Sequence, residues 1–330
     1  MSALETIKWG MIGTGDVTEQ KSGPAFSKAE GSVLHAVANR TPSKAEDYAQ
    51  RHGIRTWHPD PLDVVHDPEV DVIYVATPPD SHPHYALECI QAGKPVYLEK
   101  PMARTHAECI IINEAAREAG VKVWVAYYRR SLDYFLKVKE IIDSGRLGKI
   151  RHLRMDQHFP PRPQDLGGGD PPWRVIPDIS GGGYFHAMGC HALDILFYIF
   201  GDPLQVEGMS RNLGGLYRAD DSIDAMISLP GELSLKGNWN FVAPAERDRV
   251  EIRGDRGSLH FSVFSFEPIH LDLDSGTEEF SFERPDHIQL PHIQSIVDEL
   301  KCQGLCPSTG ENAAITSRVM DMVTGRLVNN

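Results

Sequence analysis

The sequence predicts two domains. The first is an α/β domain built on a doubly wound parallel sheet, and the second is an α+β domain with a largely antiparallel sheet that is open on one face. Two patterns predict this division: short apolar runs alternate with amphipathic stretches up to residue 128, and apolar and polar residues alternate between turns beyond residue 204. The length of 330 residues can supply two cores of ordinary size. We therefore expect domains at residues 1–128 and 129–330.

The first domain begins with five apolar runs that are typical of buried parallel strands. They are expected at residues 7–12, 32–38, 70–76, 96–98 and 121–126. Helices are expected between them, the clearest at residues 43–52, 83–92 and 105–119. This alternation predicts a sheet with helices on both faces.

A glycine-rich turn follows the first strand and consists of Gly13, Thr14, Gly15, Asp16, Val17 and Thr18. Gly13 permits a tight turn, and Gly15 lets the backbone approach a pyrophosphate at the start of the next helix. Threonine replaces the third glycine of the usual motif, which predicts slightly looser packing of helix on strand. The turn predicts a dinucleotide site made by these first residues.

The end of the second strand indicates which dinucleotide is bound. An acidic residue there usually binds the ribose of NAD, whereas an arginine can receive the 2′-phosphate of NADP. This chain has Asn39 and Arg40 and no acid at that position. Because a guanidinium pairs well with phosphate, NADP(H) is favoured, and NAD(H) bound through Asn39 is the alternative.

Polar residues also follow the third and fourth apolar runs listed above for buried strands. Thr77, Pro78 and His82 follow one of them, and Glu99 and Lys100 follow the next. Ligands of open α/β sheets bind outside the carboxyl ends of the strands, so we assign these residues to the cofactor edge. Lys100 could also hold a substrate hydroxyl. No acid or cysteine lies at ligand spacing from His82, so no metal site is expected.

Several of these segments resemble the Gfo/Idh/MocA oxidoreductases, which include glucose–fructose oxidoreductase and inositol dehydrogenase. The matching segments are Gly13-Thr14-Gly15, Ala76-Thr77-Pro78-Pro79, His82, Ala92-Gly93-Lys94-Pro95-Val96 and Glu99-Lys100-Pro101. The resemblance implies an N-terminal Rossmann domain and reversible hydride transfer between nicotinamide and a carbinol carbon of a sugar, sugar derivative or cyclitol. It also implies a homodimer or homotetramer.

The second half matches the family at a triple glycine, residues 181–183, which opens an apolar helix expected to run to residue 200. The family pattern then has an aspartate, a histidine and a second aspartate. His191 and Asp194 match the last two, but Ala187 stands at the first. Three alternatives stay open: Asp170 or Asp178 replaces the missing carboxylate, Lys100 and His191 suffice without it, or the chemistry is altered or lost.

By this resemblance Lys100 and His191 are the expected catalytic residues. Lys100 would bind the reacting oxygen, and His191 would exchange the proton. Arg130 and Trp173 are candidate substrate contacts, Trp173 because it lies in a long Pro- and Gly-rich loop, residues 160–180. Two alternatives stay open: a nicotinamide-dependent lyase, glycosidase or epimerase without net redox, and a non-catalytic dinucleotide-binding regulator, which Ala187 favours.

The remaining chain predicts the sheet of the second domain. After an extended segment at residues 150–158, about six strands are expected near residues 205–210, 222–229, 232–240, 249–254, 257–262 and 270–273. Amphipathic helices are expected near residues 287–302 and 311–327. Helices would cover one face of the sheet, and a second subunit would cover the other.

Composition excludes some classes of partner. A formal charge of −13 without basic blocks argues against nucleic-acid and anionic-membrane binding. No apolar run is long enough to cross a bilayer, and residues 1–6 show no signal-peptide pattern. Five cysteines without paired spacing are typical of a reduced protein. We expect a cytoplasmic protein.

Overall fold

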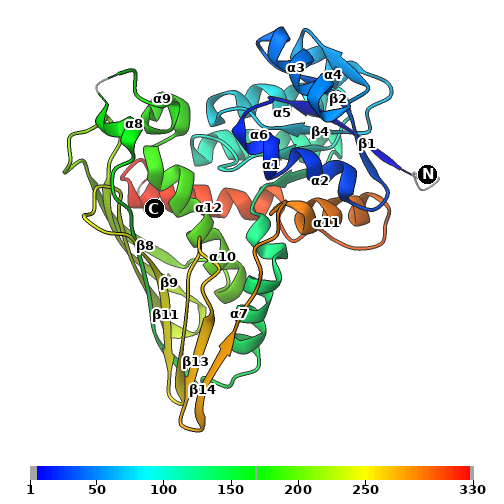
Figure 1. Cartoon of the computed structure of the whole chain (residues 1–330). Helices are drawn as coiled ribbons and strands as arrows, with labels where there is room; N and C mark the ends of the chain where they lie inside the picture. Colours follow the sequence, from blue (N-terminus) through cyan, green and yellow to red (C-terminus); the bar gives the residue numbers. More distant parts are fainter. Residues whose placement is uncertain (1–5, 168, 328–330) are drawn as a thin grey trace. The chain divides into compact units, whose positions relative to one another are not determined.

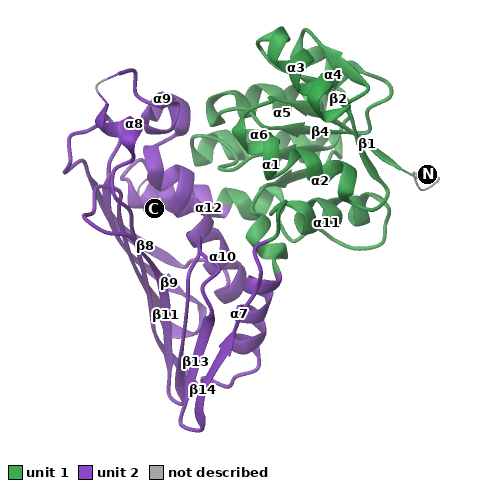
Figure 2. Cartoon of the chain, viewed as in Figure 1, with its two compact units in different colours: residues 1–132, 285–314 green, residues 133–284, 315–330 purple. Residues whose placement is uncertain are grey.

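The chain folds into two compact units (Figure 2). The computed structural model describes residues 6–167 and 169–327. The first unit comprises Met1–Leu132 and Pro285–Ala314, and the second comprises Asp133–Arg284 and Ile315–Asn330. The division expected from the sequence placed residues 285–314 in the second domain. Their contacts group them with the first unit, because the apolar face of a late helix packs into its core.

The first unit contains a parallel six-stranded sheet in the order β3-β2-β1-β4-β5-β6. This is the strand order of a Rossmann fold, as the sequence predicts. Figure 1 labels β1, β2 and β4 of this sheet. Its strands are β1 (Ile7–Ile12), β2 (Ser32–Ala38), β3 (Thr56–His58), β4 (Val72–Val75), β5 (Val96–Leu98) and β6 (Val123–Val125). Its helices are α1 (Asp16–Gln20), α2 (Gly23–Lys28), α3 (Pro42–His52), α4 (Pro61–His66), α5 (His82–Gln91), α6 (His106–Ala119) and α11 (Leu290–Leu300). Short 3₁₀ turns are η1 (Pro79–Ser81) and η2 (Tyr128–Ser131).

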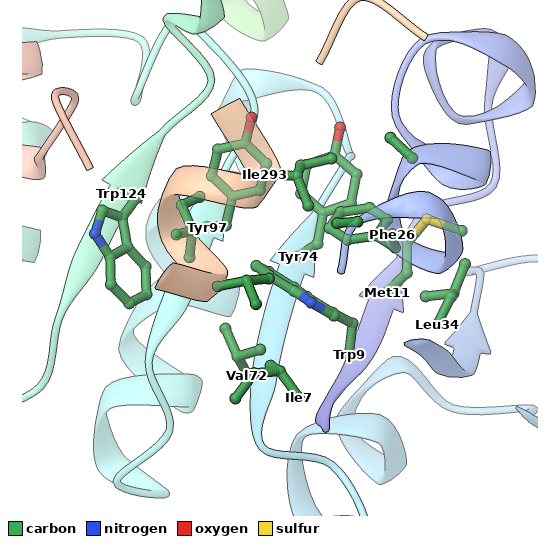
Figure 3. Close-up of a cluster of buried hydrophobic side chains, with 14 of the residues drawn as sticks. Ile7, Trp9, Met11, Phe26, Leu34, Val72, Tyr74, Tyr97, Trp124 and Ile293 are labelled. Atoms are coloured by element: carbon green, nitrogen blue, oxygen red, sulfur yellow. The ribbon is translucent and has the colours of Figure 1, made fainter. Parts of the chain in front are cut away.

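Aromatic side chains fill the core of this unit (Figure 3). The rings of Trp9 and Phe26 lie 4.6 Å apart, and those of Tyr74 and Tyr97 stack at 5.0 Å. Ile293 of α11 is fully buried in the same cluster. Because burying each large apolar side chain stabilises by about 1.5–3 kcal/mol, α11 is an integral part of this core.

The second unit contains an eight-stranded sheet in the order β14-β13-β12-β11-β7-β10-β9-β8. All neighbours are antiparallel except β7 and β10. The strands are β7 (Ile150–His158), β8 (Gln205–Arg211), β9 (Ser222–Leu229), β10 (Leu233–Asn240), β11 (Arg247–Gly254), β12 (Gly257–Phe261), β13 (Ile269–Leu273) and β14 (Gly276–Phe280). The mostly antiparallel sheet agrees with the prediction.

One face of this sheet is covered by helices of the same unit. They are α7 (Asp133–Asp143), the π-helical η4 (Phe185–Gly189) and α10 (Cys190–Phe200). The unit also contains α8 (Pro163–Leu166), α9 (Pro177–Ser180) and the 3₁₀ turns η3 (Trp173–Val175) and η5 (Pro230–Glu232). Helix α12 (Gly310–Val323) begins in the first unit and ends in the second. Phe185 packs at 4.9 Å on Trp239 of β10, whereas Lys236 of the same strand is exposed. The second face is therefore open, as the alternation predicts.

None of the helices among the described residues is long and apolar enough to cross a membrane. Residues 1–5 lie outside the described part of the chain, and a cytoplasmic location stays a prediction. Within residues 6–167 and 169–327, no group of three or more His, Cys, Asp and Glu side chains is placed to hold a metal ion.

Candidate active site

The glycine turn lies where β1 ends. Gly13 has φ 100°, and its N–H donates to the carbonyl of Ala38 at 2.8 Å. A Cβ on Gly13 would lie only 2.8 Å from the Ala76 carbonyl oxygen, so only glycine fits there. Gly15 is exposed, and a Cβ on it would meet nothing within 4 Å. The backbone at Gly15 is thus open to a ligand, which fits a pyrophosphate.

Thr18 is accommodated at the third glycine position. It is fully buried, its Oγ1 donates to the carbonyl of Gly15 at 2.7 Å, and its own carbonyl accepts from the Tyr48 hydroxyl at 2.8 Å. Asp16 is exposed and Val17 half-buried in α1, which has only five residues. The Thr18 hydroxyl therefore stabilises the glycine turn through its hydrogen bond to the carbonyl of Gly15.

Asn39 holds the turn from the end of β2. Its amide nitrogen donates to Thr14 Oγ1 at 2.9 Å, and its amide oxygen accepts from the N–H of Thr41 at 2.9 Å. Arg40 follows and is exposed. The Asn39 side chain is thus engaged within the loop, whereas Arg40 beside it is exposed.

His82 bridges the loops that follow β4 and β5. It is fully buried at the start of α5, and its Nε2 lies 2.8 Å from the Thr77 carbonyl. Its Nδ1 lies 3.1 Å from the Pro101 carbonyl and 3.2 Å from that of Met102. Burial lowers the pKa of His82, against the opposing effect of these carbonyls. Since both ring nitrogens face backbone, His82 contributes to the edge by holding these loops together.

The residues around His82 are also ordered. Thr77 and Pro78 are half-buried, and Thr77 Oγ1 accepts from the Ser81 hydroxyl at 2.7 Å. Their position directly after β4 brings the Thr77 backbone to the same sheet edge as the glycine turn.

Glu99 is buried immediately before Lys100. Its Oε1 accepts from the Tyr74 hydroxyl at 2.8 Å and from the Gln289 amide at 2.7 Å, and its Oε2 accepts from the Lys100 N–H at 3.1 Å. Lys100 itself is half-buried. The carboxyl group therefore anchors the backbone of the loop that carries Lys100.

Sequence reasoning missed three of the residues that support this loop. Tyr74 and Tyr97 read only as apolar strand residues, although a buried tyrosine hydroxyl usually needs a partner. Gln289 carried no local signal, since it lies 190 residues from Glu99.

Arg130 lies in η2 of the first unit and is 5% exposed. Its Nη1 donates to the carbonyl of Pro307 at 2.9 Å. At least part of this guanidinium therefore binds backbone within its own unit, and a substrate contact stays a prediction.

The triple glycine and His191 belong to the second unit. Gly181 and Gly183 have φ 89° and 75°. The sequence predicts one α-helix over residues 184–200, but its first turn is π-helical, with the Cys190 N–H bonded to the Phe185 carbonyl. His191 is 4% exposed in the first turn of α10.

A continuous α-helix over residues 184–200 would place Ala187 one regular turn before His191, on the same face of the helix. Ala187 lies within the wider turn rather than one regular α-helical turn before His191. Within this turn the Phe185 ring lies against Gly189, where a Cβ would approach it to 2.6 Å. The same ring packs on Trp239 at 4.9 Å.

The loop before the triple glycine holds Trp173 in η3, with the guanidinium of Arg174 4.5 Å from the ring centroid. Asp178 is exposed and bonds to Arg218 at 3.2 Å, and Asp170 is exposed. These residues also lie in the second unit.

The first unit thus brings most of the predicted cofactor residues together. The glycine turn, Asn39, Thr77 and Lys100 follow β1, β2, β4 and β5, whose carboxyl ends meet at one edge of a parallel sheet. His191 and Trp173 are positioned by the second unit.

Comparisons with known proteins agree with this arrangement. Residues 7–127 match the family model for the oxidoreductase family with an NAD-binding Rossmann fold, and residues 135–260 match the GFO/IDH/MocA C-terminal domain. The chain is 36% identical to Oxidoreductase P35 of Formosa agariphila, over 97% of this chain and 98% of that protein.

Two solved structures are similar over almost the whole chain, at 20% identity each. A levoglucosan dehydrogenase in complex with NADH and L-sorbose has a TM-score of 0.85, and covers 97% of each chain. A 3-ketoreductase from Actinomadura kijaniata in complex with NADP has a TM-score of 0.83, and covers 96% of this chain and 97% of that one. The motifs, the strand order and the full-length relative together identify the chain as a member of the Gfo/Idh/MocA oxidoreductase family.

Proposed function

We propose that this oxidoreductase is a dehydrogenase or reductase that transfers a hydride between nicotinamide and a carbinol carbon of a sugar, sugar derivative or cyclitol. The observation that carries the proposal is the position of Lys100. It lies two residues after β5, at the sheet edge where the glycine turn and Asn39 also lie. Levoglucosan and L-sorbose, the sugars bound in complexes of the similar levoglucosan dehydrogenase, support a polyhydroxylated substrate.

In this proposal Lys100 and His191 are the catalytic residues. The Lys100 ammonium binds the reacting oxygen and favours its alkoxide character. His191 takes the hydroxyl proton in oxidation and returns it in reduction, a task suited to imidazole, which ordinarily titrates near 6.5. Because residue 187 is alanine, this proton transfer proceeds without a carboxylate at that position. Bound nicotinamide supplies the hydride acceptor or donor.

For the cofactor we propose NADP(H) in preference to NAD(H). Arg40 is exposed where β2 ends, and the Asn39 side chain already bonds to Thr14 and to the N–H of Thr41. A fork of guanidinium donors matches a phosphate dianion. Arg130 and Trp173 are proposed substrate contacts.

Two other functions are alternatives, and each would give a different result in assays of turnover and cofactor release. A lyase, glycosidase or epimerase would reduce and reoxidise its nicotinamide within one cycle and release no reduced cofactor in step with product. A regulator, which Ala187 favours, would bind dinucleotide without turnover on a broad polyol panel and would form a stable complex with another protein.

The test is a panel of sugars, sugar derivatives and cyclitols assayed by nicotinamide absorbance, with both cofactors and in both directions. Lys100→Ala should lower turnover of any substrate found by at least ~100-fold, the scale of a positioned acid–base group. Lys28→Ala, at an exposed lysine in α2, should not. Near-normal turnover of Lys100→Ala would remove Lys100 from the mechanism.

We also propose that the open face of the second sheet joins copies of the chain into a homodimer or homotetramer. Charges of both signs lie on this face: Lys236 and Arg154 are paired neighbours, and Glu251 lies beside Arg154. Met209 and Met226 are 49% and 43% exposed there. Exposed methionines among charges of both signs suit an interface between identical surfaces.

A further inference from the structure

We propose that Gln289 is a positioning residue for Lys100 and acts on it through Glu99. The inference rests on the function proposed above, in which Lys100 binds the reacting oxygen. Gln289 itself would touch neither substrate nor cofactor. Its role would be to fix the backbone from which the Lys100 side chain projects.

The first step concerns the orientation of the Gln289 amide. The side chain is fully buried, its Nε2 donates to Glu99 Oε1 at 2.7 Å, and its Oε1 accepts from the Tyr97 hydroxyl at 2.8 Å. The reverse orientation would set the amide oxygen against a carboxylate oxygen. The amide can therefore satisfy both neighbours in one way only.

The second step leads from Glu99 to Lys100. Glu99 Oε1 also accepts from the Tyr74 hydroxyl, and Oε2 accepts from the Lys100 N–H at 3.1 Å. Figure 3 shows the hydroxyl oxygens of Tyr74 and Tyr97 on the same side of the aromatic cluster. Removing the Gln289 amide would leave Glu99 one donor short and Tyr97 without its acceptor, so the buried carboxyl would shift.

The third step concerns what holds Gln289. Its N–H donates to the Lys21 carbonyl at 3.2 Å, and His287 Nδ1 lies 2.7 Å from the Gln20 carbonyl. Residues 287–289 thus lie against the end of α1, which follows the glycine turn. The same short segment thus contacts α1 and, through Gln289, the carboxyl group of Glu99 that anchors the Lys100 loop.

The test compares Gln289→Met, which keeps the volume and removes both hydrogen bonds, with Gln294→Met on the same helix. Gln294 is also hydrogen bonded, to Glu30 at 2.7 Å and Asp298 at 2.8 Å, but away from the loop. Gln289→Met should lower kcat about 10- to 100-fold, as expected of a misplaced catalytic group, with the cofactor Kd changed less than about threefold. In a Lys100→Ala background it should cause no further loss.

A second measurement does not depend on activity. The exchange rate of the Lys100 N–H can be followed in a peptide that contains Lys100 and Pro101, since Pro101 has no N–H of its own. This rate should be at least ~10-fold higher in Gln289→Met than in the wild type, and unchanged in Gln294→Met. Tyr97→Phe, which removes one bond of the Gln289 amide, should shift exchange in the same direction if Gln289→Met proves too unstable to study.

The outcomes separate the two proposals. Wild-type exchange at Lys100 in Gln289→Met, or the same loss in Gln294→Met, would overturn the role of Gln289. Faster exchange together with normal turnover of Lys100→Ala would retain the anchor and overturn the proposed function. A slow Lys100→Ala enzyme with a fully active Gln289→Met variant would retain the function and reject the positioning role.

Discussion

Two glycines of the turn after β1 have different tasks, and alanine should separate them. At Gly15, with φ −95° and nothing within 4 Å of a Cβ, alanine should cost less than about 1 kcal/mol of unfolding free energy. It should raise the cofactor Kd at least ~10-fold, because the methyl group occupies the approach of a pyrophosphate. At Gly13, alanine should be clearly destabilising. Urea denaturation and NADPH fluorescence titration measure both effects, and unchanged binding in Gly15→Ala would exclude the turn as the phosphate site.

Arg40 offers the sharpest test of cofactor choice. Arg40→Ala should raise the KM for NADPH roughly 10- to 100-fold, since a hydrogen bond to a charged group contributes about 1.5–3 kcal/mol. The KM for NADH should change little. Arg55, an exposed arginine of the same unit, gives the control variant Arg55→Ala. Equal loss with both cofactors would contradict a 2′-phosphate contact.

For single residues, the sequence predicts a position in the fold where the signal lies in neighbouring residues. The glycine turn and Lys100 stand next to the apolar runs that position them, so their place at the sheet edge could be predicted. The Tyr97–Gln289 bond joins residues 192 positions apart. No spacing rule connects two such residues, because only the folded chain brings them together.

Among the elements, α11 carries a buried histidine with a clear pH consequence. Its residue His292 has Nε2 3.2 Å from the Val125 carbonyl and Nδ1 2.9 Å from the Ser131 hydroxyl. Burial lowers the pKa of His292 to about 3. Between pH 6.5 and 3 the unfolded chain therefore binds a proton that the folded chain does not, and stability falls as the pH is lowered.

The expected loss from this residue between pH 7 and pH 5 is about 2 kcal/mol. His292→Gln should reduce the pH dependence of the unfolding free energy by a similar amount. His84→Gln, at an exposed histidine, should leave the pH dependence as it is. The wild type and both variants are compared by urea denaturation at pH 7 and pH 5. If the wild type and His292→Gln lose the same free energy of unfolding between these pH values, His292 is protonated in the folded state.

The elements that sequence reasoning missed have weak patterns. Strands β3 and β14 have three and five residues, and β14 is almost wholly exposed, so neither shows a buried apolar run. The π turn of η4 was also missed, because helical periodicity cannot show one extra residue in a turn. The packing of Phe185 on Trp239, which accompanies this turn, joins two distant parts of the chain.

On the scale of the whole molecule, the first unit should need residues 285–314 in order to fold. Residues 1–132 alone would leave Tyr74, Tyr97 and Trp124 without the α11 residues that pack with them. This fragment should lack near-ultraviolet circular dichroism, whereas residues 1–132 joined by a flexible linker to residues 285–314 should fold and bind NADPH. Cooperative unfolding of the short fragment would contradict this.

The proposed assembly can be tested on the open sheet face. Met226→Arg adds a charge next to Lys236, its partner in β10, and should convert the assembly to monomers at micromolar concentration. Light scattering gives the mass. Leu305→Arg, at a leucine 82% exposed in the first unit, should leave the mass unchanged, and an unaltered mass in Met226→Arg would place the contact elsewhere.

The order in which the chain passes between its units has a consequence during synthesis. The parallel sheet leaves the ribosome long before α11, the helix that completes its core. At usual translation rates of about 5–20 residues per second, this nascent sheet waits roughly 10 to 30 s with an apolar surface uncovered. We expect it to be held by chaperones over that interval, and the cofactor edge to form only after α11 has emerged.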